Sequence, residues 1–184
     1  MYINVGTPGR CNDSHIFEKS ALKQHHQNPI LTHLSTQING VNVPVVMLGD
    51  SAFRFSDILM KPYPYRENAS FSEKNFNYAL SKCRRVVENA FGHLKARFRR
   101  RGKGLDNRID NVNLIIKCAC VLHNFLNEKN DCINNRWMQQ LREQEETVVR
   151  PQPEFNCTLT DNNLTAENIR SAIAMFLVRQ PLPA

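Results

Sequence analysis

Three acidic residues stand where a carboxylate could do chemistry, and Asp50 is the first of them. It directly follows Gly49 at the end of an apolar run, VPVVMLGD, over residues 43–50. In open α/β sheets ligands bind beyond the carboxyl ends of the strands, so a carboxylate there could face a ligand. An aspartate that bonds the backbone of its own turn is equally common after a strand. Asp50 alone does not decide between a ligand site and a turn.

Glu88 is the second candidate, and it borders the apolar face of a predicted helix. At about 100° per residue its neighbours on the helix surface include Arg84 and Gly92, and the apolar stripe lies about 110° away. A glycine inside a helix costs about 1 kcal/mol relative to alanine, so Gly92 predicts the close approach of another backbone or of a ligand. The alternative is an intrahelical ion pair between Glu88 and Arg84 or Arg85. Both interpretations stay open at this point.

Asp13 is the third candidate, and it has the simplest alternative explanation. It stands where an N-cap belongs, before a helical stretch that runs to about residue 24. N-capping by itself accounts for an aspartate at such a position. Because capping and metal ligation are compatible, Asp13 remains a candidate ligand.

The elements that would position these carboxylates alternate between strand and helix. A short strand, YINV, begins at residue 2, and the continuous apolar run over 43–50 predicts a strand buried on both faces. Residues 61–69, with two prolines, form a loop. Ser70 and Glu73 make a capping box that opens a long helix. The apolar stripe of this helix advances in steps of three and four, as core packing requires; it comprises Phe76, Leu80, Cys83, Val87, Phe91, Leu94 and Phe98.

Two further helices are predicted toward the end of the chain. Asp110 caps a helix through about residue 128 that is apolar around most of its circumference, which is typical of a central helix. Residues 130–163 are polar and indicate a linker. Thr165 caps a short amphipathic helix. The predicted organisation is therefore a domain over 1–129, a linker over 130–163, and a short helix and tail over 164–184.

The basic charge of the chain is concentrated in one segment. The 184 residues have a net charge of +7 and are 41% hydrophobic, which is ordinary globular composition. Between Lys82 and Lys103, nine Lys and Arg against Glu88 alone give +8, which leaves −1 for the rest. A solvated basic face is the alternative, but it would use interleaved acids for ion pairs. The segment therefore favours a nucleic-acid partner.

Composition and motifs exclude several other classes. No apolar run approaches the length of a membrane span, and the first residues lack a signal-peptide pattern. The six cysteines have no framework spacing, which indicates reduced thiols in an intracellular protein. Cys118, Cys120 and His123 could suggest zinc. Residues two apart on a helix face different ways, however, so core packing is the favoured interpretation.

Five motifs, in order, carry a resemblance to a known family. They are PGxxxDS (8–14), LGDS (48–51), Glu73 to Asn77, the RxxxE helix with FGxLKxRF (84–98), and CxCVLHNF (118–125). Together they resemble the nuclease domain of PIF/Harbinger-type DDE transposases and the Harbinger-derived nucleases. The resemblance covers about residues 1–129. It implies an α/β, partial ribonuclease H-like fold: a mixed sheet flanked by helices, first strands missing, with a C-terminal helical segment.

The resemblance also implies a metal site and a substrate. Its acidic motif positions fall on Asp13, Asp50 and Glu88, which would hold Mg²⁺ or Mn²⁺, with Asp50 and Glu88 catalytic in DNA cleavage and transfer. Carboxylate oxygens are hard ligands suited to these ions. The basic residues that would line the DNA are Arg84, Arg85, Lys95, Arg97 and Arg99.

The chain departs from the family pattern at its start. The family's first catalytic aspartate lies on a strand upstream of the PGxxxD motif, and its DNA-binding region lies further upstream; we find neither in this sequence. The expected function is a DDE-type, metal-binding nuclease or transposase domain that is catalytically incomplete as given, acting on DNA with a separate DNA-binding protein as a partner. The expected location is the nucleus, with the cytoplasm as the alternative. The competing function is a non-enzymatic, transposon-derived DNA-binding or interaction protein.

Overall fold

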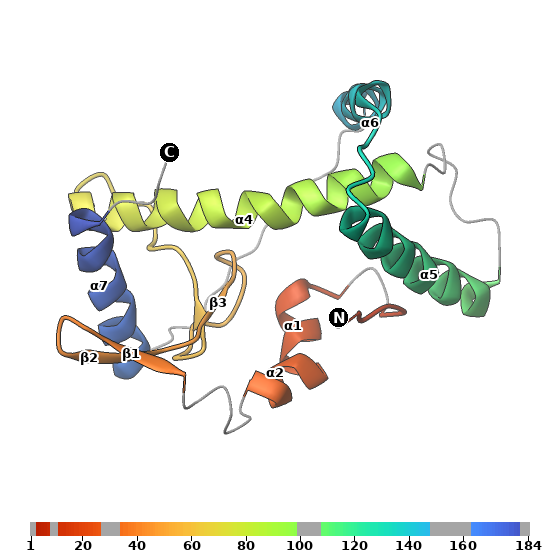
Figure 1. Cartoon of the computed structure of the whole chain (residues 1–184). Coiled ribbons are helices and arrows are strands. Elements are labelled where there is room, and N and C mark those ends of the chain that lie inside the picture. Colours follow the sequence, from red (N-terminus) through yellow and green to blue (C-terminus); the bar gives the residue numbers. More distant parts are fainter. Residues whose placement is uncertain (1–2, 8–10, 27–33, 99–107, 148–162, 181–184) are drawn as a thin grey trace. The chain divides into compact units, whose positions relative to one another are not determined.

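The chain folds into two compact units of helices and small sheets, as a computed structural model shows (Figure 1). The structure describes residues 3–7, 11–26, 34–98, 108–147 and 163–180. Unit 1 comprises Met1–Pro8 and Val86–Glu154, and unit 2 comprises Gly9–Arg85 and Phe155–Ala184. The predicted α/β class is confirmed, and the mixture of helices and small sheets is compatible with a partial ribonuclease H-like fold.

Unit 2 contains a β-hairpin that the sequence analysis did not predict. Strands β1 (Ser35–Ile38) and β2 (Val41–Pro44) pair antiparallel, with Ser35 opposite Pro44. Asn39 and Gly40 form the turn, with φ of 50° and 78°. A two-residue hairpin turn with positive φ at both positions favours Asn-Gly, because these residues adopt the left-handed conformation at low cost.

A second two-stranded sheet precedes Asp50. Strands β3 (Met47–Leu48) and β4 (Leu59–Met60) pair in parallel. The prediction of one doubly buried strand over 43–50 is therefore wrong, because the run is divided between two sheets. Val45 and Leu48 are 45% and 43% exposed. Two-stranded sheets leave much of their surface uncovered, so these two side chains of the run reach solvent.

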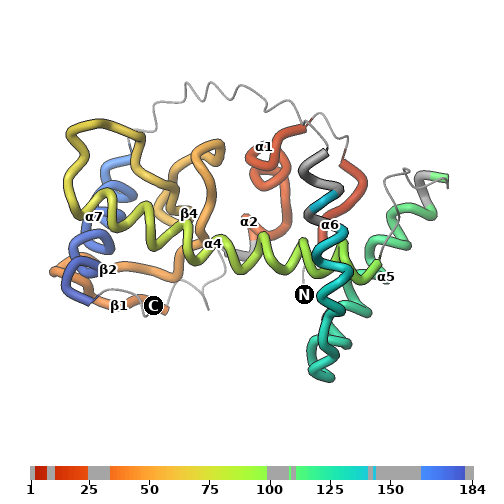
Figure 2. The backbone as a smooth tube through the Cα atoms, turned by 90° about the horizontal axis from the view of Figure 1, so that it is seen from above, coloured from red at the N-terminus to blue at the C-terminus, as the bar shows by residue number. Residues whose placement is uncertain are grey.

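The core of unit 2 is closed by helix α7 (Leu164–Arg179), which packs on the hairpin. Figures 1 and 2 both show α7 beside β1 and β2. The core residues come from β2, β4, the intervening loop, the first half of α4 and α7: Val43, Phe55, Met60, Phe76, Leu80, Ala166, Ile169, Ala172 and Ala174. The N-cap of α7 is Asn163, which accepts the Ala166 N–H at 3.1 Å, so the predicted cap at Thr165 is two residues late.

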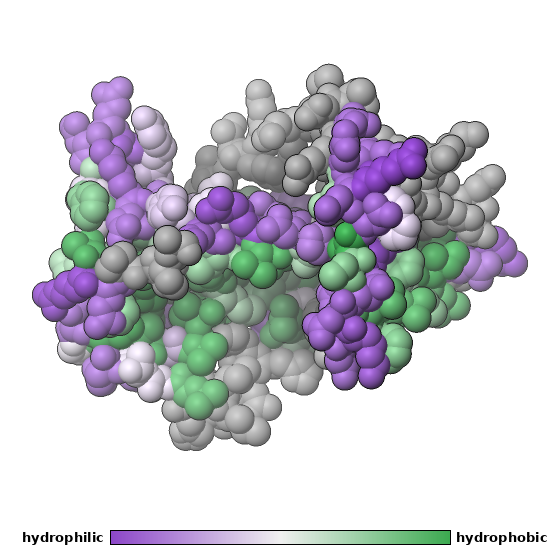
Figure 3. Space-filling model, turned by 45° about the horizontal axis from the view of Figure 1, so that its top comes forward, coloured by the Kyte–Doolittle hydropathy of each residue, from purple (hydrophilic) through white to green (hydrophobic). Residues whose placement is uncertain are grey.

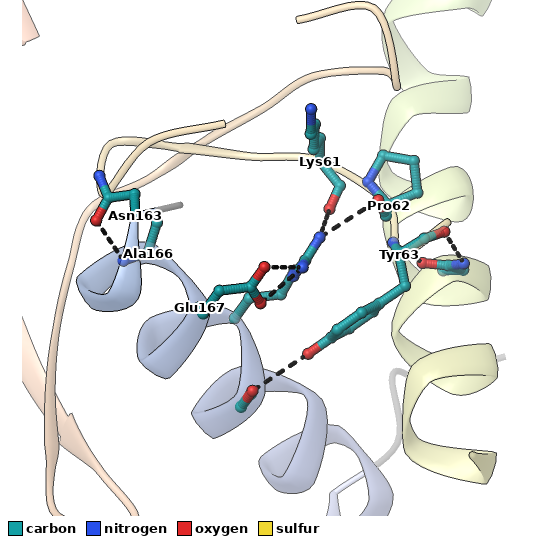
Figure 4. A network of polar contacts seen from close by, with 9 residues as sticks. Lys61, Pro62, Tyr63, Asn163, Ala166 and Glu167 are labelled. Atoms are coloured by element: carbon teal, nitrogen blue, oxygen red, sulfur yellow. Dashed lines mark hydrogen bonds and ion pairs between the residues drawn. The ribbon is translucent and has the colours of Figure 1, made fainter. Parts of the chain in front are cut away.

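A buried arginine ties α7 to the loop over residues 61–70 (Figure 4). The side chain of Arg170 is 5% exposed, and its guanidinium lies 4.3 Å from the ring centroid of Phe55 and 3.9 Å from that of Tyr63. Its Nη2 donates to both carboxylate oxygens of Glu167 at 2.7 Å. Burial of this charge is compensated by the ion pair with Glu167 and the two aromatic faces, so the contact is structural.

The segment that bears Asp13 forms two short helices rather than one. They are α1 (Asp13–Glu18) and α2 (Ala21–His26). Asn12 is the N-cap of α1, and its Oδ1 accepts the His15 N–H at 2.8 Å, so the prediction that Asp13 caps this helix is wrong by one residue. Asp13 is the first helical residue and is exposed, a position where an acid complements the helix dipole.

Helix α4 (Phe71–Arg97) begins as predicted. Glu73 Oε2 accepts the Ser70 N–H at 2.8 Å, and Ser70 Oγ accepts the Glu73 N–H at 3.3 Å, which confirms the capping box. The predicted apolar stripe is right only for its first half. Phe76 is 3% exposed, but Phe91 is 58% exposed. In unit 1 the buried contact is made by Ala96, 1% exposed, which lies off the predicted stripe.

Unit 1 pairs the second half of α4 with α5 (Ile109–Glu128) and α6 (Asn135–Thr147). The N-cap of α5 is Arg108 rather than the predicted Asp110. The prediction that α5 is central is wrong for the described residues, because most of its large apolar side chains are exposed; Leu114, Ile115, Val121, Leu122 and Phe125 range from 41% to 60%. Figure 3 shows apolar (green) residues gathered over this helix.

Two other segments of unit 1 differ from the sequence predictions. Residues 3–7, which include most of the predicted YINV strand, form no strand. Helix α6 falls within the segment 130–163 predicted as a linker; residues 148–162 lie outside the described part of the chain. None of the helices in the described ranges is long and apolar enough to cross a bilayer.

Candidate functional site

The Asp50 carboxylate lies in a turn directly after β3. Its Oδ1 accepts the Ala52 N–H at 2.9 Å, and its backbone carbonyl accepts the Phe53 N–H at 3.3 Å, so the turn interpretation is confirmed. Its Oδ2 lies 3.6 Å from Nη2 of Arg84 on α4, and the two side chains are 39% and 33% exposed. One oxygen therefore orders the turn, while the other faces a cation at an accessible position.

Close packing at Gly49 holds this turn in place. The Gly49 N–H donates to the Met60 carbonyl at 2.9 Å, and the residue is buried. A Cβ at Gly49 would lie 2.8 Å from Leu59 Cδ2 and 3.1 Å from the Phe53 ring. Leu59 is itself only 2% exposed, so it has little room to move away. Only glycine at this position lets β3 lie this close to β4 and so positions Asp50.

The two glycines that flank the candidate carboxylates should respond oppositely to substitution. Gly49→Ala should lower the free energy of unfolding by about 1–3 kcal/mol, because the added methyl overpacks a closed site. A Cβ at Gly92 would meet, among the described residues, only Met138 Cε at 3.8 Å. Gly92→Ala should therefore raise the free energy of unfolding by up to about 1 kcal/mol, because alanine has the higher helix propensity.

Urea denaturation followed by circular dichroism measures both effects, with each variant serving as the control for the other. In the described part of the chain a side-chain atom of Met138, rather than a backbone, lies nearest to the methyl added at Gly92, and the approach of a ligand to Gly92 stays a prediction. A Gly92→Ala protein that is less stable than the wild type would contradict this account of the site.

Helix α1 packs against the Asp50 turn through two aromatic rings. The centroids of Phe17 and Phe53 are 5.9 Å apart, with the rings at 71°. Residues four apart share one face of a helix, so Asp13 lies on the same side of α1 as Phe17. The structure thus brings the segments that bear Asp13 and Asp50 together within unit 2.

Glu88 lies on the part of α4 that belongs to unit 1. It is exposed and follows Arg84 by one helical turn. Within the described ranges, no group of three or more His, Cys, Asp or Glu side chains is placed to hold a metal ion. As exposed or half-exposed carboxylates, Asp13, Asp50 and Glu88 are suitable donors for Mg²⁺ or Mn²⁺, and their convergence stays a prediction.

A family model described as "DDE superfamily endonuclease" matches residues 1–124, more than half of the chain. The chain belongs to this family. All three candidate carboxylates of the DDE-superfamily chain lie inside the matched range, and so does the whole of α4. Neither a search of curated proteins nor a search of solved structures found a match.

The basic residues predicted to line DNA have different environments in this DDE-superfamily chain. Arg85 and Lys95 are exposed, and Arg84 is half-buried beside Asp50. Arg99 lies outside the described residues. Arg97 is the exception, because its side chain is only 4% exposed.

Arg97 joins α4 to the end of α5 through a set of hydrogen bonds inside unit 1. Its Nη1 donates to Asn127 Oδ1 at 2.7 Å and to the carbonyl of His123 at 3.2 Å, and it lies 3.2 Å from Nδ1 of His123. Its Nη2 donates to the Asp131 carbonyl and lies 3.5 Å from Asp131 Oδ2. These contacts favour a structural role for Arg97 over its predicted contact with DNA. The four-residue spacing of His123 and Asn127 could have indicated a shared polar partner.

The same contacts explain the titration of His123. The ring is buried, at 6% exposure, and burial together with the nearby charges of Arg97 and His93 lowers the pKa of His123 below its ordinary value of 6.5. The folded chain therefore favours the neutral imidazole.

Acidification should weaken unit 1 through His123. The unfolded chain protonates this residue near pH 6.5 and the folded chain at lower pH, so its stabilisation is present above pH 6.5 and is lost as the pH falls through the folded pKa. Urea denaturation at pH 7.5 and 5.5, followed by the fluorescence of Trp137, the single tryptophan, measures the loss. His123→Asn should show a smaller difference between the two pH values; an equal difference would assign the effect to other groups.

Cys118, Cys120 and His123 are arranged differently from the predicted core cluster. Cys118 is exposed and Cys120 is half-buried, while His123 is buried. The packing interpretation is therefore right for His123 and wrong for Cys118. The ring of His123 is occupied by Arg97 and by Asn127, whose Nδ2 lies 3.1 Å from Nε2.

Proposed function

We propose that this DDE-superfamily chain is a PIF/Harbinger-type, divalent-metal-binding domain of an endonuclease that acts on phosphodiester bonds of DNA, and that it is catalytically incomplete as given. The observation that carries the proposal is the Asp50 turn. Asp50 lies directly after β3 inside the family match, with one carboxylate oxygen half-exposed and 3.6 Å from Arg84 on α4. A carboxylate beyond a strand end, facing the helix that bears Glu88, has the sequence order expected of such a site.

Asp13, Asp50 and Glu88 are proposed as the metal ligands, with Asp50 and Glu88 catalytic. When bound there, Mg²⁺ or Mn²⁺ would activate the attacking water or 3′-hydroxyl and stabilise the leaving oxygen. Arg84 balances the charge of Asp50 in the absence of a cation. Because a cation on Asp50 would repel Arg84, that guanidinium would turn to a phosphate oxygen of the DNA. Arg85 and Lys95, both exposed, would hold the same backbone.

The proposed partner is DNA, with a separate protein supplying further DNA recognition, and the proposed location is the nucleus. The net charge of +7 supports DNA as the partner. A basic stripe beside candidate metal ligands would hold the anionic backbone in place, with a binding constant that falls steeply with salt.

A second function, a non-enzymatic DNA-binding or interaction protein derived from a transposon, is favoured by one observation. Asp50 already serves its own turn and faces Arg84, and no three-donor cluster occurs in the described part of the chain. Such a protein would use the basic residues of α4 without a metal.

Nicking of supercoiled plasmid, by this chain and by a version extended upstream with a strand that carries the missing aspartate, distinguishes the two functions. The proposal predicts open-circular product from the extended version with Mn²⁺ or Mg²⁺ and none with EDTA. Plasmid binding in a gel-shift assay without nicking under any metal would instead support the non-enzymatic function. Nicking that persists in EDTA would contradict the metal-dependent mechanism.

A further inference from the structure

The outward face of the first half of α4 interleaves aromatic and basic side chains. We call it the aromatic–basic stripe: Phe71, Lys74, Tyr78, Lys82 and Arg85. At about 100° per residue these five positions fall within an arc of about 80°. Phe71 and Tyr78 are 73% and 63% exposed. Both rings therefore lie in solvent on the same face of the helix.

The stripe lies opposite the buried face of the same helix. Phe76 and Leu80, which are 3% and 5% exposed, project toward the core of unit 2 about 160° from the centre of the stripe. The stripe therefore cannot turn inward without breaking that core. All five residues belong to unit 2, and Figure 3 shows hydrophilic (purple) side chains along α4.

The charge of the stripe is of one sign. Lys74 and Arg85 are exposed and Lys82 is half-buried, which gives three cations on this face. The only acid in this part of the helix is Glu73, whose carboxylate is turned back to the Ser70 N–H at 2.8 Å. The face therefore presents positive charge and aromatic rings, with no acid between them.

We propose that the aromatic–basic stripe binds single-stranded DNA, with bases stacked on Tyr78 and Phe71 and phosphates held by the cations. Proteins that bind single strands combine these two features, because every base has a face that stacks and every phosphate carries a charge. The two rings are seven residues apart, about 10 Å along the helix. That separation leaves room for phosphates beside Lys74, which lies between them.

A protein partner fits the stripe less well. Lysine is depleted at the centres of protein interfaces, because its ammonium group would lose its water there. The rings of the stripe are separated by cations rather than joined into one apolar patch. An acidic protein is therefore treated as an outcome of the test.

The inference rests on the proposed function, because it takes DNA as the polyanion. It adds that the DNA is single-stranded and names the residues that bind it. Fluorescence anisotropy of a labelled dT20 oligonucleotide with the full chain tests it, in EDTA and over a series of salt concentrations. Tyr78→Ala should weaken binding roughly 5- to 100-fold. Tyr78→Phe should bind like the wild type, because the ring is kept. Lys74→Gln should lower the salt dependence by about 0.7 in the log–log slope.

Two matched variants control for general effects. Tyr65 is 94% exposed in the loop before α4, so Tyr65→Ala removes an exposed ring outside the stripe and should have little effect. Lys23 pairs with Glu18, so Lys23→Gln removes a cation outside it and should leave the salt slope unchanged. Circular dichroism of each variant should match that of the wild type, because the substituted side chains are exposed or, for Lys23, half-buried at the surface.

Several results would overturn the inference. They are wild-type affinity in Tyr78→Ala, equal losses in Tyr78→Phe and Tyr78→Ala, or displacement of dT20 by polyglutamate equally well from the wild type and from Tyr78→Ala. Binding of dT20 in EDTA does not depend on the metal ligands. Failure of metal-dependent nicking with intact dT20 binding would therefore overturn the proposed nuclease function alone.

Discussion

Replacement of Arg97 by methionine should lower the free energy of unfolding by about 2–3 kcal/mol. The guanidinium is buried, and its loss leaves Asn127 Oδ1 and the His123 carbonyl without their charged donor. Asp131 is half-exposed and can be solvated by water, which keeps the effect below that of a fully buried ion pair. Urea denaturation monitored by Trp137 fluorescence, which reports on unit 1, measures the change.

Arg85→Met is the matched control, because Arg85 lies on the same helix and is exposed. It should change the free energy of unfolding by less than about 0.5 kcal/mol. DNA affinity should respond in the opposite order, falling for Arg85→Met. Equal stability of the two variants, with DNA binding lost in Arg97→Met, would show that Arg97 contacts DNA after all.

In the version extended upstream with the missing aspartate, Asp50→Asn should reduce metal-dependent plasmid nicking by at least about 100-fold. Even outer-shell residues of metal sites change activity or affinity by about 10- to 100-fold, and a ligand should matter at least as much. Asparagine keeps an oxygen to accept the Ala52 N–H, so the turn after β3 should persist. The expected loss is therefore of cation binding rather than of the fold.

Asp57→Asn provides the control for this substitution. Asp57 is an exposed aspartate seven residues further along in unit 2, and it has no proposed part in the site. Its variant should nick plasmid at the wild-type rate. Wild-type nicking by Asp50→Asn would remove Asp50 from the site.

Capping residues in the sequence predict the start of a helix well when no second capping residue lies nearby. The Ser70 and Glu73 capping box is formed as predicted because its bonds span only three residues. The caps of α1 and α7 were misplaced by one and two residues, since Asn12 and Asn163 are also good caps nearby. Adjacent capping residues differ little in intrinsic preference, and backbone geometry selects between them.

Features that depend on distant pairing were harder to predict. The Asn39–Gly40 turn is a strong local hairpin signal, but the continuous apolar run over 43–50 that follows it predicts one strand. Its division between two sheets depends on β1 and β4, which are short and lack alternation. The burial of α4 shows the same limit, since periodicity predicts an apolar stripe but not the neighbour that covers it.

The candidate site was predictable as a set of residues rather than as an environment. The sequence indicated Asp50 and left its turn role and its ligand role open; the structure shows the turn role and adds the pair with Arg84. Charge pattern alone grouped Arg97 with the other cations. Its burial became visible only when His123, Asn127 and Asp131 were seen to converge on it.

Titration of the full chain with Mn²⁺, followed by the electron paramagnetic resonance signal of the free ion, tests the central claim most directly. We expect saturable binding that is weakened at least about 10-fold by Asp50→Asn and by Glu88→Gln alike. Glu67→Gln, which changes an exposed loop acid, should bind as the wild type does. Mn²⁺ binding that is absent from the wild type, or unchanged in both carboxylate variants, would contradict a metal centre built from Asp50 and Glu88.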